Sequence, residues 1–379
     1  MPPRGHLEVF EKIKPKLVFG ISIASFWVTD QPLRDRVLIG TPFISVIFGL
    51  ILSLIHLASN FDGHLTMNLV MTQIIIVATL QIFLKTLWIW YDRDNLLKLL
   101  NKAISLHEEY ENEEICAIVE KNLKKLNNIW IICFKITFVS IYITCVLVTI
   151  YNALKGEDGI CITIPFIPQE FPGHLEIMLL IQTFVIFSGS FSVLYTDFVT
   201  VFFGIEIMAA SNILFHYISL HKEVIQEHPH DLKIITVRFC ELVENVKLYN
   251  DVISPSSFIQ FITSAFLSFL IFFFTRLNPE NPVGYFLGFC VVLQLFAPCL
   301  FGEFIKIRME RLSTTLYLTN WYDLKLKSQK SFLLVLGMTQ REYGLKAAGL
   351  YNISIYTFIQ ILKMAFSWCA FMFTLEAYY

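Results

Sequence analysis

Seven apolar segments of this chain are each long enough to cross a lipid bilayer as a helix. The hydrocarbon core of a bilayer is about 30 Å thick, which a helix crosses with about 20 residues. Of the 379 residues, 55% are hydrophobic and only 16% are charged, more apolar side chains than a soluble core needs. The sequence therefore predicts an all-α membrane protein. Its seven segments run approximately over residues 37–56, 67–91, 129–153, 175–211, 258–275, 283–304 and 347–375.

A shorter apolar stretch, residues 17–27, precedes the first of these segments and is interrupted by Gly20 and Ser22. We expect an interfacial or re-entrant helix there rather than an eighth crossing. The start of the chain, MPPRGHLEVFEKIKPK, is polar and basic, whereas a secretory signal peptide has an early apolar run. We therefore expect the amino terminus to stay in the cytoplasm.

The positive charges alternate between the loops. Lys and Arg are frequent before the first segment and in the second, fourth and sixth loops, and scarce in the other three. The densest set lies between Lys306 and Lys346, just before the last segment. Because Lys and Arg near span ends are retained in the cytoplasm, this pattern predicts a cytoplasmic amino terminus and an extracellular carboxy terminus. G-protein-coupled receptors have the opposite orientation.

Two of the basic loops carry helical patterns. In the fourth loop, apolar residues recur at steps of four and three, with Asp231 as the expected N-cap and Pro255 as the expected end of the helix. Residues 312–340 of the sixth loop mix basic and apolar residues. We expect a cytoplasmic helical region whose apolar faces pack within one subunit or against another. The apolar positions of the fourth loop are Ile235, Phe239, Leu242, Val246, Tyr249 and Ile253.

Enzymatic and metal sites are not expected. The cluster His228-Pro229-His230-Asp231 has no accompanying Cys or Glu group, and its short spacing is typical of a loop. No Gly-rich phosphate loop and no Gly-x-Ser-x-Gly turn is present. We expect no cofactor and no nucleic-acid partner. Cys161 is the one cysteine of the outer loops, and the cysteines are interpreted as small apolar fillers.

The carboxy-terminal third, roughly residues 315–379, carries a series of short motifs. They begin with Trp321, the Leu-rich stretch that ends at Gln340, and the turn at Lys346-Ala347 and Gly349. They continue through the last segment in Thr357-Phe358, Ile361-Leu362-Lys363 and Phe366-Ser367-Trp368. This set of motifs is specific and resembles the insect odorant receptor family.

Two differences from related proteins narrow the assignment within this family. Related gustatory receptors carry Thr-Tyr and Gln-Phe pairs where this chain has Ser367-Trp368 and Thr374-Leu375, and the shared co-receptor of the family has a large insertion in the fourth loop, which is compact here. The chain thus looks like an odorant-tuning subunit. The resemblance implies a ligand-gated, non-selective cation channel of olfactory neurons, a heterotetramer with the co-receptor in the plasma membrane of the sensory dendrite. Each last span would line a central pore.

These expectations divide the chain into six regions. The regions are 1–36, the cytoplasmic amino-terminal segment with the interfacial helix; 37–215, spans one to four; 216–254, the cytoplasmic helical loop; 255–305, spans five and six; 306–346, the cytoplasmic anchor helix; and 347–379, the pore-lining seventh span.

The last segment carries a polar stripe. Asn352, Thr357, Gln360 and Ser367 lie toward one side of a helix, and Phe371 and Leu375 continue that side. Matching positions in the family form a hydrophobic constriction, so the resemblance implies a pore and gate at Gln360, Ser367, Phe371 and Leu375. The alternative is ordinary helix packing.

Lys363, Asp197 and Glu206 are among the charged residues that fall inside the predicted spans. A charge in a span is costly and usually faces protein or water. Because a lysine in a cation pathway would repel the permeant ion, we expect Lys363 to pair with an acid or a carbonyl group. Asp197 and Glu206 of the fourth segment are interpreted as structural partners rather than as a selectivity ring.

A small volatile ligand should bind in the outer halves of segments two to six, in an apolar pocket with a few polar contacts. Interhelical packing is the alternative for each candidate residue, and a seven-span metabotropic receptor or transporter of small apolar ligands is the alternative function. A transporter should show internal repeats, and none is visible. The candidates are Gln73, Val77, Tyr142, Cys145, Thr149, Phe184, Ser188, Tyr285 and Phe289.

Overall fold

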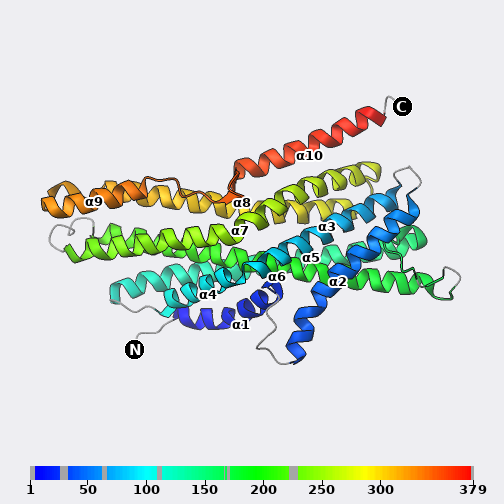
Figure 1. The fold of residues 1–379 in the computed structure, drawn as a ribbon, viewed down its shortest axis with the longest axis horizontal. Coiled ribbons are helices and arrows are strands. Elements are labelled where there is room, and N and C mark those ends of the chain that lie inside the picture. The colour runs from blue at the N-terminus through cyan, green and yellow to red at the C-terminus, as the bar shows by residue number, and fades with distance from the viewer. Residues whose placement is uncertain are drawn as a thin grey trace.

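The computed structural model describes residues 5–25, 33–61, 66–108, 113–165, 167–168, 171–221 and 229–376, and these residues are almost entirely helical. The predicted all-α class is therefore confirmed (Figure 1). Short 3-10 turns η1 (Gly156–Gly159) and η2 (Trp321–Asp323) and a hairpin of β1 (Lys346–Ala347) and β2 (Tyr351–Asn352) are the exceptions. The helices are α1 (Gly5–Ser25), α2 (Leu33–Asn60), α3 (Met67–Tyr91), α4 (Arg93–Glu108), α5 (Glu113–Lys155), α6 (His174–His221), α7 (Pro229–Leu277), α8 (Pro282–Tyr317), α9 (Leu326–Thr339) and α10 (Ile355–Glu376).

Seven helices among the described residues are long and apolar enough to cross a membrane, which confirms the predicted number. They are α2, α3, α5, α6, α7, α8 and α10. Several are much longer than a bilayer requires. With a rise of about 1.5 Å per residue, the 48 residues of α6 extend about 72 Å, more than twice the hydrocarbon thickness.

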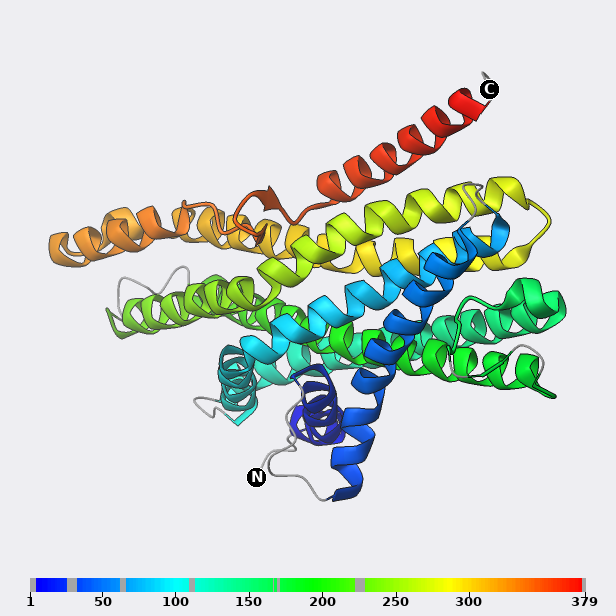
Figure 2. The same cartoon turned by 45° about the vertical axis from the view of Figure 1, so that its right-hand side comes forward.

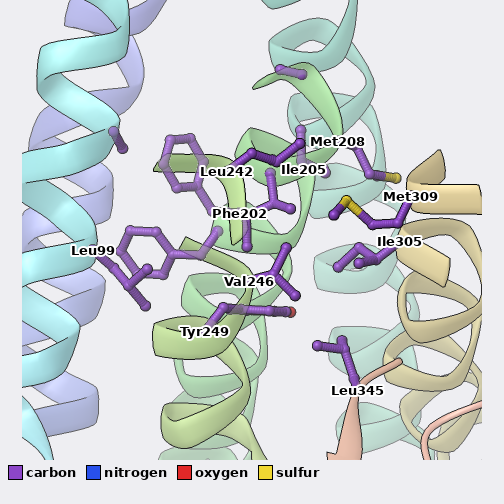
Figure 3. Close-up of a cluster of buried hydrophobic side chains, with 14 of the residues drawn as sticks. Leu99, Phe202, Ile205, Met208, Leu242, Val246, Tyr249, Ile305, Met309 and Leu345 are labelled. Carbon is purple, nitrogen blue, oxygen red and sulfur yellow. The ribbon is translucent and has the colours of Figure 1, made fainter. Parts of the chain in front are cut away.

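The long helices project from one end of the bundle, where α4 and α9 join them (Figure 1). We call this end the extension, and the opposite end, where α2 connects to α3 and α7 to α8, the distal end. The larger hydrophobic core continues into the extension. Figure 3 shows part of this core, with Leu99 from α4, Phe202 from α6, Val246 from α7 and Met309 from α8. The predicted apolar face from Ile235 to Ile253 is buried there and is confirmed.

The expected amino-terminal helix exists, but it is longer than predicted and packs on protein. Helix α1 begins at Gly5, passes through Pro15 and contacts α4, α5 and α6. Phe10, Ile13, Leu17 and Ile21 are all buried in the core. The sequence could not show this, because an apolar stripe has the same spacing whether it faces lipid or protein.

Pro255 does not end the helix of the fourth loop, as we had expected. Helix α7 continues through it to Leu277. A proline inside a helix removes one backbone hydrogen bond and crowds the preceding turn, but Ser254, Ser256 and Ser257 beside it are buried and the helix packs on α3, α6, α8 and α10. Packing against the neighbouring helices here outweighs the tendency of proline to end a helix. The expected N-cap Asp231 has its side chain outside the described residues, and α7 starts at Pro229.

The last predicted span begins later than its apolar run. Residues 346–352 form the hairpin, with Ala348 and Gly349 at φ values of 49° and 69°, so the predicted turn is confirmed. Asn352 lies in β2 and is not part of a helical stripe, contrary to our expectation. Helix α10 starts at Ile355 and diverges from the other helices toward its carboxy-terminal end (Figure 2).

Candidate functional site

A second buried apolar cluster, the distal cluster, lies toward the distal end, apart from the larger core. It is formed by four helices and by the loop after η1, and Val77, one of the predicted ligand residues, packs against it. An apolar interior between several helices is a typical environment for a small-molecule site in a bundle. The distal cluster consists of Val70, Met71 and Ile74 of α3, Val148 of α5, Cys161, Leu267, Leu270, Ile271, Phe273 and Phe274 of α7, and Val283 of α8.

The segment from Gly159 to Cys161 is held against the bundle, beside this cluster, by hydrogen bonds to α6. The backbone N–H of Cys161 donates to Oε1 of Gln182 at 2.7 Å, and Nε2 of Gln182 donates to the carbonyl oxygen of Gly159 at 3.0 Å. A side chain at Gly159 would overlap the carbonyl oxygen of Asn152, so this close approach to α5 requires glycine. Complete burial raises the pKa of the Cys161 thiol to about 12, which keeps it protonated and is consistent with the filler role predicted for it.

Asn152, Ser264 and Ser268 are among the buried polar side chains, on the helices that form the distal cluster, that have atoms without a hydrogen-bond partner among the described residues. The atoms are both amide atoms of Asn152 on α5 and the hydroxyl oxygens of Ser264 and Ser268, one turn apart on α7. Leaving such an atom unpaired costs about 1–3 kcal/mol. A hydroxyl or carbonyl group on a ligand would satisfy an atom of this kind.

Five of the predicted ligand residues lie partly or fully inside the bundle. Gln73, Val77, Thr149 and Ser188 are partly buried, and Cys145 is buried. The Cys145 thiol donates to Ser190 Oγ at 3.2 Å, and Ser188 Oγ lies 2.6 Å from Ser45 Oγ. Cys145 and Ser188 thus already have contacts between helices, and the part of all five residues in ligand binding stays a prediction.

The other four predicted ligand residues lie on the surface of the subunit. The side chains of Tyr142, Phe184, Tyr285 and Phe289 are each more than half exposed. The structure therefore does not bring them together in the interior with the other five. Lipid is as apolar as the interior between helices, so helical spacing alone did not separate lipid-facing from protein-facing aromatic side chains.

None of the predicted ligand residues lies on α7, although α7 supplies five of the eleven members of the distal cluster. A signal was present, because Leu267, Leu270, Ile271 and Phe274 are spaced as on one helix face. That signal is weak in the surrounding run FLSFLIFFF, where nearly every position is apolar.

A buried ion pair connects four helices inside the spans. Nζ of Lys85 on α3 lies 2.7 Å from Asp197 Oδ1 on α6 and donates at 2.6 Å to Gln260 Oε1 on α7, and Lys85 is only 3% exposed. Gln294 of α8 donates to Asp197 Oδ2 at 2.9 Å, and Gln260 Nε2 donates to the backbone oxygen of Gln294. The predicted structural role of Asp197 is confirmed. Lys85 was not among the predicted structural partners.

Glu206, which also lies on α6, contacts a histidine side chain. Its Oε1 lies 3.7 Å from Nε2 of His107 on α4, whose Nδ1 lies 2.8 Å from the carbonyl oxygen of Ala103. The ring of Phe10 stacks on His107 with centroids 3.9 Å apart. This contact joins α1, α4 and α6 and supports the predicted structural role.

Helix α10 has one face packed and one face open. Ile361, Ala365 and Cys369 are buried. Among the described helices, α10 packs mainly against α7 and α8. Gln360, Ser367 and Phe371, three of the four predicted pore residues, are exposed on the opposite side. Leu375 belongs to the same helix, but its side chain lies outside the described residues.

Lys363 does not have the partner that we expected. Its side chain is exposed on α10, and within the described part of the chain no carboxylate forms an ion pair with it. The reason is positional, since among the described helices α10 packs mainly against α7 and α8, and Lys363 is not on the contacting side. The sequence could not show on which side of the helix an acid would be available.

Metal chemistry finds no support among the described residues, where no group of three or more His, Cys, Asp or Glu side chains could hold an ion. His228 of the cluster considered above lies outside them.

Solved structures with the same fold are insect olfactory receptors. OR5 from Machilis hrabei in complex with eugenol superimposes with a TM-score of 0.80 at 12% identity, covering 98% of this chain and 99% of that chain. A second structure of OR5 from Machilis hrabei gives a TM-score of 0.75 at 11% identity, covering 97% of this chain and 98% of that chain.

Sequence comparisons give the family. Odorant receptor 33b of Drosophila melanogaster is 28% identical over 133 residues, which are 34% of this chain and 35% of that protein. Odorant receptor 33c of the same organism is 30% identical over 105 residues, 27% of each chain. These matches span only about a third of the relatives' lengths, but the model of the family described as 7tm Odorant receptor matches residues 65–366. The chain is therefore a multi-pass protein of the plasma membrane that belongs to the seven-transmembrane odorant receptor family of insects.

Proposed function

We propose that the chain is the odorant-binding, tuning subunit of a heteromeric, ligand-gated, non-selective cation channel in the dendrites of olfactory neurons. Its partner is the odorant receptor co-receptor, with which it forms a heterotetramer. The extension is cytoplasmic and the distal end is extracellular. Family membership, the compact α6–α7 connection and the distribution of Lys and Arg support this assignment.

The ligand is a small volatile organic molecule that binds at the distal cluster. The cluster is apolar, lies between helices and has the unpaired polar atoms of Asn152, Ser264 and Ser268 on its helices. A solved receptor with the same fold holds eugenol. The partly buried candidates Gln73, Val77, Cys145, Thr149 and Ser188 extend this site, and Tyr142, Phe184, Tyr285 and Phe289 bound it from the outside.

The observation that carries the proposal is the double role of α7. One side of α7 supplies Leu267, Ile271 and Phe274 to the distal cluster. Another side contacts α10, where Phe272 stacks on Phe366 with ring centroids 4.0 Å apart and Phe266 lies 5.7 Å from Trp368. Any ligand that repositions α7 must therefore change the support of α10.

Gating follows from differential affinity. A ligand shifts an equilibrium only by binding one state more tightly than the other. An odorant that fits the distal cluster better when α7 has moved favours the state in which the four pore helices separate. The exposed stripe of Gln360, Ser367 and Phe371, together with Leu375, lines the pore, and the ring at Phe371 and Leu375 opens by widening.

Recording current during odorant application tests this proposal. Cells express this chain alone, the co-receptor alone, both chains or neither. We expect an odorant-evoked cation current that requires this chain for its odorant selectivity and the co-receptor for its amplitude. Correct surface delivery of both chains with no such current, or a response that depends on G proteins or on substrate transport, would reject the channel assignment.

A further inference from the structure

We propose that the ammonium group of Lys363 faces the water of the ion pathway and sets the ratio in which the channel conducts divalent and monovalent cations. This inference rests on the channel function proposed above and assigns a selectivity role to one residue of the pore helix.

The first observation is the position of Lys363 on α10. It lies three residues after Gln360 and four before Ser367, whose hydroxyl donates to the Lys363 carbonyl oxygen at 2.9 Å. All three side chains are exposed, whereas Ile361, Ala365 and Cys369 on the other side are buried against the bundle. Lys363 therefore belongs to the polar stripe, which is the side of the helix least suited to lipid.

The second observation is the environment of the charge. From Lys346 to Leu375 the chain has no Asp or Glu, and Glu376 is 13 residues from Lys363, about 20 Å along the helix. No carboxylate elsewhere in the described ranges pairs with it. A lysine kept charged inside a span without an acid needs water around it.

Lys85 shows how this chain treats a lysine that faces protein. That side chain is buried, and its ammonium group contacts the Asp197 carboxylate and the Gln260 amide oxygen. Among the residues that the structure describes, Lys363 has no comparable partners. The difference between the two lysines favours an aqueous surrounding for Lys363 over a protein contact.

A fixed positive charge in a pore acts most strongly on divalent cations. At about 4 Å in bulk water, repulsion between unit charges corresponds to about a fivefold lower occupancy, and for a divalent cation the factor is squared, about 25-fold. Salt screens part of this effect. Removing the charge should therefore raise the calcium-to-sodium permeability ratio by about two- to fivefold.

The test measures reversal potentials of odorant-evoked current in cells that express this chain with the co-receptor, with calcium and then sodium as the external cation. We expect Lys363→Gln to raise the permeability ratio and Lys363→Arg to leave it at the wild-type value. Lys330→Gln is the matched control, since Lys330 is exposed on α9 and its loss changes the net charge equally. An unchanged ratio in Lys363→Gln with normal current would overturn the inference.

A second measurement uses one cell before and after modification. In Lys363→Cys, a membrane-impermeant, positively charged methanethiosulfonate applied with odorant should restore the wild-type ratio, and the wild-type chain should not respond to it. A thiol in lipid or in a protein contact would not react, which would also overturn the inference, as would loss of current in every Lys363 variant while the wild type conducts. Loss of current in the wild type itself would instead reject the channel function.

Discussion

At the scale of single residues, the buried polar groups explain how the spans are held in register. Hydrophobic burial does not select one helix neighbour over another within a membrane, so polar contacts and close packing make that choice. Lys85, Asp197, Gln260 and Gln294 come from four different helices and meet through charge-assisted hydrogen bonds. This network fixes α3 and α6 against the two helices that support α10.

The Lys85 network gives a prediction about stability. Lys85→Met leaves Asp197 without its cation, and breaking a buried pair in this way costs about 3–5 kcal/mol. We expect a large fall in the melting temperature of the purified complex and poor surface delivery. The double variant Lys85→Met, Asp197→Asn should recover most of the loss, because it leaves no unpaired charge. A single variant as stable as the wild type would show that the pair does not hold these helices.

Ser268 gives a prediction that separates ligand binding from folding. Its buried hydroxyl lacks a partner among the described residues, so Ser268→Ala removes no hydrogen bond of the protein and should not destabilise it. For an odorant with a hydroxyl or carbonyl group, loss of one ligand hydrogen bond of about 1 kcal/mol should raise the half-maximal concentration about fivefold.

Thr263→Ala is the control for Ser268. The Thr263 hydroxyl donates to the carbonyl oxygen of Ile259 at 2.8 Å, one turn earlier on α7, and we expect no change in odorant sensitivity when it is removed. Equal sensitivity of wild type, Ser268→Ala and Ser264→Ala to every polar odorant would argue against a ligand at the distal cluster.

At the scale of elements, the connection between α8 and the start of α10 is unusually close. A side chain at Gly302 of α8 would overlap the backbone of Ile353, which lies between β2 and α10. The N–H of Ile353 donates to the Leu345 oxygen at 2.8 Å and that of Ala348 to the Ser254 oxygen at 3.3 Å, so the hairpin is fixed on both sides. The base of α10 has little freedom to shift.

Gly302→Ala should therefore displace the base of α10. We expect a reduced odorant-evoked current per channel at the surface, measured by recording together with surface biotinylation. Gly337→Ala on α9 is the matched control, since a side chain at this position meets no atom within 4 Å. Alanine also stabilises a helix by up to about 1 kcal/mol relative to glycine, so this variant should not disturb the fold. If both glycine variants behave like the wild type, the seating of α10 on α8 is not important for gating.

The elements also show how far sequence could predict this fold. The spans, their number and the apolar face from Ile235 to Ile253 follow from length and period, which are local properties. The continuation of α7 through Pro255 and the hairpin before α10 depend on neighbouring helices, which local patterns do not contain. In α7 the uniform run of Phe and Leu also hid which residues face the distal cluster.

The exposed faces of the site helices were predicted correctly where polar side chains distinguish one face of a helix from the other. The prediction failed where both faces of the helix are apolar. The exposed side of α10 was found at Gln360 and Ser367 because polar residues are rare in a span. Tyr142 and Phe289 were placed with the interior although they are exposed, because aromatic side chains suit lipid and protein equally. Lys85 was overlooked, although a lysine within a span is itself a strong signal of a functional or structural contact.

At the scale of the whole molecule, the exposed side of α10 has no counterpart within one subunit. The helix leans away from the bundle (Figure 2). Among the described helices it packs mainly against α7 and α8, and the side chains of its polar stripe are exposed. In a tetramer, four such helices placed around one axis would face one another across water. That arrangement accounts for Gln360, Lys363 and Ser367, which would be costly in lipid.

The most direct test of the channel assignment is an electron cryomicroscopy structure of this chain assembled with the co-receptor. We expect Ser367 and Phe371 of α10 to point into a continuous axial opening that is narrowest near Phe371 and Leu375. An α10 whose stripe contacts lipid, in a complex without any opening along its axis, would contradict the account.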